Sequence, residues 1–208
     1  MQSEKISVQN NDNSIEAALS VADDFINELK TGQKYSMRLR LLVEETLGMV
    51  RAMVGDFSAD FWMESNEKVT KVRLDVVTYM NSEKKSDLLS MSTSGVNVSA
   101  KGFMGMISDI IENGLLNYDS VMSMHNSVNQ ANINYSSMGM GMISDVVDNA
   151  YMWSLQNYRD NLNNVSEDVD GKSEAWDQLE RSIVAKIADD VIVGVKSDNA
   201  TLTVIYNF

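Results

Sequence analysis

Apolar residues recur every three to four positions in two segments near the start of the chain. In residues 15–29 this spacing predicts a helix with one apolar face, with Ser14 as its N-cap and Gly32 marking its end. A second helix is expected over residues 35–54, closing at Gly55. Residues 5–8, ahead of both, are typical of a short strand.

Apolar and polar residues alternate in the segments that follow and at the C-terminal end. Residues 59–64 and 69–80 predict two antiparallel strands around a turn at 65–67. Residues 191–195 and 202–206 predict a second hairpin, preceded by a helix over 173–188. This order of elements predicts an α+β fold, a two-layer sandwich in which helices cover one face of a mixed or antiparallel sheet.

The middle of the chain is expected to be mainly helical, with polar connections. Residues 81–92 predict a weak helix and residues 93–99 a loop, and helices follow to about residue 170. Two segments, 105–113 and 141–149, are similar at an offset of 36 residues. Two copies fall short of the three or more that repeat arrays need, so we interpret them as two similar amphipathic helices. We expect one domain, 1–208, with a helical, Met-rich insertion at about 95–170.

Composition excludes several classes of function. The net charge of -13 repels phosphate backbones and anionic lipids, so neither nucleic acid nor a membrane is an expected partner. The lack of a long apolar segment and of a signal-peptide pattern predicts a cytoplasmic protein. The chain has no cysteine, and its single histidine, His125, cannot build a histidine metal cage. His125 lies in a polar stretch, so we expect it in an exposed loop.

Two segments, 41–50 and 183–205, carry a resemblance to a known family. They resemble the GHKL (Bergerat-fold) ATPase superfamily, and within it anti-sigma-factor kinases and histidine-kinase-like ATP-binding domains. In that family a helix presents a Glu, and four residues later an Asn holds the magnesium of bound ATP. The Glu corresponds to Glu45, and residues 183–191 and 201–205 match the closing helix, acidic pair and hairpin.

The chain departs from that family at the nucleotide motifs. Met49 stands where the magnesium-holding Asn is expected, and a soft thioether is a poor ligand for a hard cation. The family's Asp and glycines are missing after the strand, in residues 77–82, and its second glycine box is missing near 180–182. Lys101 and Gly102 are a candidate substitute for phosphate binding at a helix start, with a purely structural cap as the alternative.

Glu45 is the candidate catalytic residue, and the resemblance implies a general base if a phosphate donor is held nearby. The candidate cofactor-binding residues are Glu45, Met49, Lys101 and Gly102, and we expect no metal site built by the chain itself. The alternative for the acidic pair, Glu44 and Glu45, is exposed ion pairing with neighbouring arginines.

Three functions remain open at this point. The favoured hypothesis is a non-enzymatic regulator that binds a protein partner, sigma-factor-like or another regulator, after ATP binding was lost or weakened. The second is an active ATP-binding serine kinase or ATPase with a divergent pocket, for which ATP and magnesium are the cofactors implied by the resemblance. The third is a self-associating structural protein, a homo-oligomer whose duplicated helices form the interface.

Overall fold

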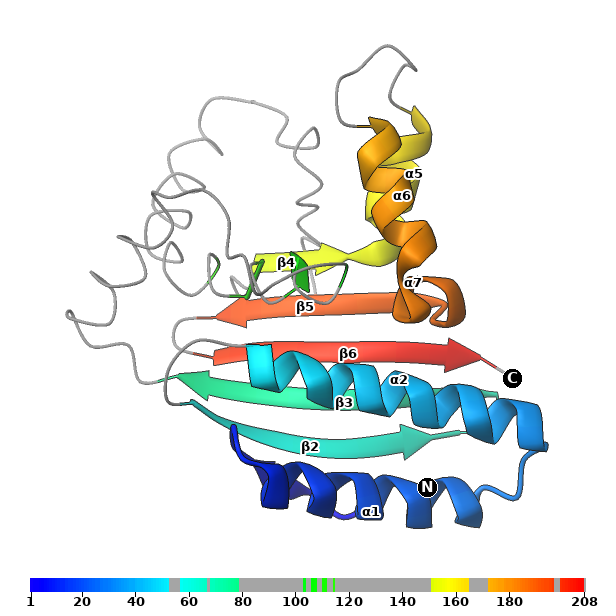
Figure 1. The fold of residues 1–208 in the computed structure, drawn as a ribbon, viewed down its shortest axis with the longest axis vertical. Coiled ribbons are helices and arrows are strands. Elements are labelled where there is room, and N and C mark those ends of the chain that lie inside the picture. The colour runs from blue at the N-terminus through cyan, green and yellow to red at the C-terminus, as the bar shows by residue number, and fades with distance from the viewer. Residues whose placement is uncertain are drawn as a thin grey trace.

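The described part of the chain is built around one antiparallel sheet (Figure 1). The computed structural model describes residues 1–52, 57–66, 68–78, 103, 106, 107, 110, 111, 114, 151–164, 172–196 and 199–207. The strands are β1 (Ile6–Val8), β2 (Phe57–Ser65), β3 (Val69–Thr78), β4 (Tyr151–Ser154), β5 (Asp190–Lys196) and β6 (Asn199–Asn207). They are arranged in the order β1-β2-β3-β6-β5-β4, and each described pairing is antiparallel.

Helices form the second layer. Helices α1 (Asp12–Glu28) and α2 (Gln33–Ala52) lie across one face of the sheet (Figure 1). Three more follow β4 in the chain: α5 (Leu155–Asn164), α6 (Lys172–Arg181) and α7 (Ile183–Ile187). Of these, α7 contacts α2, whereas α5 and α6 stand beside the β4 edge. The predicted α+β sandwich is therefore confirmed, with an antiparallel sheet.

Alternation along the strands gives the sheet one buried face and one open face. In β3, Val72, Leu74 and Val76 are fully buried, and the positions between them face away from the helices. The core is completed by the apolar sides of α1 and α2, which include Ala18, Ala22, Phe25, Leu39, Leu42, Val43 and Leu47. The opposite face of the sheet carries the polar positions.

The first helix begins earlier than its sequence pattern indicated. Asn11, not Ser14, is the N-cap: its backbone is extended, and its side-chain oxygen accepts a hydrogen bond of 2.9 Å from the Ser14 backbone N–H. The Ser14 hydroxyl instead donates to the Gln9 carbonyl. Because helical geometry already starts at Asp12, Ser14 occupies the third helical position. The side chain of an N-cap residue accepts a hydrogen bond from the backbone N–H at that position.

The C-terminal helix predicted over 173–188 is two helices. Ser182 is extended (φ -82°, ψ 128°), and its hydroxyl accepts a hydrogen bond from the Ala185 backbone N–H. A serine side chain that bonds to the backbone ahead of it competes with continuous helix, which explains the break.

The expectation of helices and polar connections up to about residue 170 is wrong at β4. Residues Tyr151–Ser154 pair with β5, and Trp153 is buried with its ring 6.3 Å from that of Phe103. Four residues are too few to show an alternating pattern, and the pairing partner lies about 40 positions further along the chain.

Part of the first duplicated segment is described and helical. Its residues Ile107 and Ile111 are fully buried in the core, and a side-chain carbon added to Gly114 would meet the Val195 side chain of β5 at 2.8 Å. These residues therefore pack over β5, on the side of the sheet that α2 covers. The predictions for 81–92, 93–99, 141–149 and His125 lie outside the described residues.

Candidate functional site

The two glutamates of α2 have different surroundings. Glu44 is exposed, and its carboxylate accepts a hydrogen bond of 2.8 Å from Arg40, which also pairs with Asp23 of α1. This ion-pair chain links the two long helices, so the expected pairing with an arginine is confirmed for Glu44.

Glu45 lies on another side of the helix. Successive residues are about 100° apart around a helix, while residues four apart share a face, so Glu45 lies on the side of Met49. It is half-buried, and it makes no ion pair within the described part of the chain. Glu45 thus lies at the border between core and solvent.

Met49 is part of the hydrophobic core. Only 2% of its surface is exposed, and it belongs to the same cluster of buried side chains as Phe103, Ile107 and Ile111. A magnesium ion requires oxygen ligands and retains several waters, whereas this position offers a thioether in an apolar environment. The residues here do not fit the magnesium ion that the family resemblance implies.

Residues 180–182, where the resembled family has its second glycine box, also lack phosphate-binding geometry. At residues 180–182 the hydroxyl of Ser182 already satisfies the Ala185 N–H, and the guanidinium of Arg181 lies 3.8 Å from the carboxylate of Asp177. Helix α7, which follows, has only five residues. The other candidate phosphate-binding residues, Lys101 and Gly102, lie outside the described residues.

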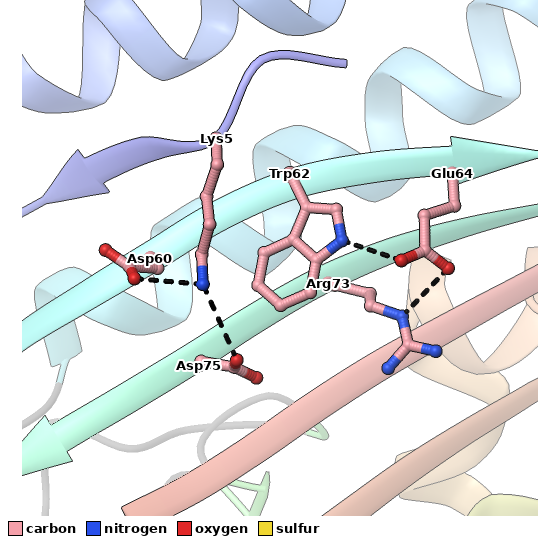
Figure 2. A network of polar contacts seen from close by, with 6 residues as sticks. All are labelled: Lys5, Asp60, Trp62, Glu64, Arg73 and Asp75. Atoms are coloured by element: carbon pink, nitrogen blue, oxygen red, sulfur yellow. Dashed lines mark hydrogen bonds and ion pairs between the residues drawn. The ribbon is translucent and has the colours of Figure 1, made fainter. Parts of the chain in front are cut away.

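A charged cluster that was not predicted from the sequence lies on the open face of the sheet (Figure 2). The register of β2 and β3 places Asp60 opposite Asp75 and Trp62 opposite Arg73. Two carboxylates directly opposite each other repel. Lys5, just before β1, offsets this repulsion, because its ammonium nitrogen lies 3.0 Å from Asp60 and 4.0 Å from Asp75.

Trp62 forms the centre of this cluster and is 8% exposed. The Lys5 ammonium lies 4.4 Å from the ring centroid, and the Arg73 guanidinium carbon 5.9 Å. The indole N–H donates a hydrogen bond of 2.8 Å to Glu64, which also accepts one of 3.2 Å from Arg73. Chiefly because of the indole hydrogen bond, the pKa of Glu64 is lowered from its ordinary value.

Asp75 provides a pH-dependent test of this cluster. Burial raises the pKa of Asp75, against the opposing effect of Lys5 and Arg73. Because the pKa of Asp75 is higher in the folded state than in the unfolded state, its contribution to the free energy of unfolding is fully present below the unfolded pKa of ~4. That contribution is lost as pH rises through the folded pKa. We therefore expect Asp75→Asn to gain stability relative to wild type between pH 4 and neutrality, by about 0.5 kcal/mol because the group is partly exposed.

Urea unfolding at pH 4, 5.5 and 7 measures this difference. A variant that is less stable than wild type at pH 7, by the same margin as at pH 4, would contradict the assigned environment of Asp75.

Two surface depressions lie near the N-terminal segment, away from Glu45 and Met49. One of about 380 Å³ is lined by residues that include Met1, Glu64 and Lys71, and one of about 240 Å³ by residues that include Glu4, Asp24 and Glu28. Within the described ranges, no three metal-ligating side chains gather in one place. No helix in the described part is both long enough and apolar enough to cross a bilayer.

Comparisons with known proteins identify no relative. No family model matches the chain, and the searches of curated proteins and of solved structures found no match either.

Proposed function

We propose that this protein is a cytoplasmic regulator that acts by binding a partner protein and does not depend on bound ATP. The burial of Met49 carries the proposal. In the family that the chain resembles, the corresponding residue holds magnesium, and a core methionine cannot do so. A protein with that resemblance and without the magnesium ligand retains a surface for regulation rather than the chemistry of phosphoryl transfer.

Exposed apolar side chains on the helical layer support protein binding. Met37 and Leu41 lie four residues apart on one side of α2 and are 60% and 37% exposed. Ile183, at the start of α7, is 42% exposed, and α7 contacts α2. We call Met37, Leu41 and Ile183 the helical patch. Apolar side chains exposed on adjacent helices are typical of sites that contact another protein, here a sigma-factor-like or other regulatory partner.

One observation favours the second hypothesis, an ATP-binding kinase or ATPase. Glu45 is only half-buried and is not held in an ion pair within the described residues. Its carboxylate could therefore accept a proton from a substrate, which is the role of a general base. This hypothesis still needs magnesium and a triphosphate bound beside Met49.

Nucleotide binding separates the two hypotheses. We expect no change in the thermal unfolding midpoint of the wild-type protein at millimolar ATP and magnesium. A ligand at 100 times its Kd would stabilise the fold by about 2.7 kcal/mol and shift the midpoint by several degrees. A saturable shift that disappears in Glu45→Ala would show that nucleotide binds beside α2 and would contradict a regulator that does not depend on ATP.

Site-specific photo-crosslinking in the native cell tests the partner. A crosslinking residue at Leu41 should yield a discrete adduct with one protein, whereas the same residue at Glu16, exposed on α1, should not. Identical adducts from both positions would indicate nonspecific contact and would contradict docking at the helical patch.

A further inference from the structure

We propose that two copies of this chain associate face to face through the open face of the sheet, the face opposite α1 and α2. This surface is distinct from the helical patch, so the proposal does not rest on the proposed regulatory function.

The open face is balanced in charge, although the chain as a whole carries -13. Outward positions of β2, β3 and β5, with Lys5 beside them, supply four acidic and four basic side chains, Asp60, Glu64, Asp75 and Asp190 against Lys5, Lys71, Arg73 and Lys196. Two copies of a strongly acidic protein repel each other over most of their surface. Repulsion is smallest where the facing surfaces are neutral, because charges more than about 8 Å apart are screened at physiological salt.

The strand register places these residues in rows across the sheet. One row contains Arg73 of β3 opposite Thr203 of β6, and the next outward row contains Asp75 opposite Thr201. On β5, Asp190, its first residue, and Lys196, its last, lie in the rows on either side of these two. On β3 and on β5, basic and acidic side chains therefore occupy different rows of the same strand, whereas Asp60 and Glu64 of β2 are both acidic.

That order suits a twofold axis lying in the interface, perpendicular to the strands and between the two central rows. A closed dimer uses the same patch of both copies, so each contact occurs twice. The axis turns one copy over, so that each strand faces the same strand of the other copy and the two central rows face each other. Arg73 of one copy then faces Asp75 of the other, Thr203 faces Thr201, and Lys196 faces Asp190. An axis along the strands would instead place Glu64 opposite Asp190, which have the same charge.

The central groups are available for these contacts. Arg73 uses its Nε to reach Glu64, and its two terminal nitrogens have no hydrogen-bond partner among the described residues (Figure 2). Asp75 has a cation only at 4.0 Å, and 38% of its side chain is exposed. A second copy would supply each group with a close, oppositely charged partner, and burial of Asp75 next to Asp60 makes such a partner favourable.

The face is also large enough. The four longest strands alone provide a flat area of about 500 Å², from strand spacings of about 4.8 Å and a rise of about 3.4 Å per residue. The shorter strands extend it toward the ~800 Å² that each partner contributes to a standard interface.

Sedimentation equilibrium on the full chain tests the proposal. We expect wild type to reach twice its monomer mass of 23.2 kDa at concentrations near 100 µM. Arg73→Glu and Asp75→Lys should each weaken association at least about tenfold, because each places like charges opposite each other twice. An equimolar mixture of the two variants should form a dimer again, since the acidic centre of one then faces the basic centre of the other.

A matched pair of exposed lysines provides a second test if those variants fold poorly. Lys196→Glu lies on the open face and Lys186→Glu on α7, and the two variants carry the same net charge. Only Lys196→Glu should weaken association. The proposal is wrong if wild type stays monomeric at this concentration, if both lysine variants weaken association equally, or if Arg73→Glu and Asp75→Lys, folded by circular dichroism, dimerise like wild type.

Discussion

Replacing Met49 by asparagine is expected to destabilise the protein by about 3 kcal/mol and to leave it without measurable affinity for ATP and magnesium. The substitution introduces the oxygen ligand that the resembled family uses. Because Met49 is 2% exposed and surrounded by apolar side chains, the new amide would be buried without hydrogen-bond partners. That burial costs about 1–3 kcal/mol, and the lost apolar contact adds about 1.5–3 kcal/mol, part of which relaxation of the core recovers.

Urea unfolding measures the change, and Met49→Leu is the control. Leucine conserves volume and polarity, so its expected cost is below about 1.5 kcal/mol. An asparagine variant as stable as wild type, with a thermal midpoint that rises on addition of ATP and magnesium, would mean that position 49 adjoins a polar pocket. The regulator hypothesis would then be wrong.

Replacing Tyr35 by alanine is expected to cost about 3–5 kcal/mol, the usual range for removing a buried aromatic side chain. The Tyr35 ring stacks on that of Tyr206 with centroids 4.8 Å apart and planes at 10°. Its hydroxyl donates a hydrogen bond of 2.6 Å to Thr70, whose hydroxyl also lies 2.9 Å from that of Ser65. One side chain thus joins the start of α2 to the ends of three strands.

Tyr35→Phe separates the hydroxyl from the ring. We expect a loss of about 1 kcal/mol, because the hydrogen bond to Thr70 is removed and the stacking on Tyr206 is kept. Chemical denaturation of both variants gives the two values. Equal losses for Phe and Ala would show that the ring contributes nothing, contrary to the packing described here.

Elements with a sustained local pattern could be predicted from the sequence. Helix α2 was expected over 35–54 and is found at Gln33–Ala52, and β2 was expected over 59–64 and is found at Phe57–Ser65. Both are long enough for their periodicity to identify the buried side, and the hairpin connections are short. The fold class followed from their order. The break at Ser182 and the four-residue β4 were missed because a single side-chain hydrogen bond and a distant pairing decide them.

Of the candidate site, the sequence identified Glu45 and the unusual Met49, but not their surroundings. Glu44 pairs with Arg40 four residues earlier on the same helix, which is a local contact, whereas the pairing of Arg40 with Asp23 of α1 depends on how the two helices pack.

The sequence alone therefore determined the buried and exposed sides of the long helices and strands, because a side chain's direction within one element depends only on its spacing along the chain. The tertiary structure alone decided that Lys5 lies between Asp60 and Asp75, that Met49 is enclosed, and that the open face is neutral in a chain of net charge -13. Those features depend on strand register and helix packing, which bring together residues that no local pattern relates.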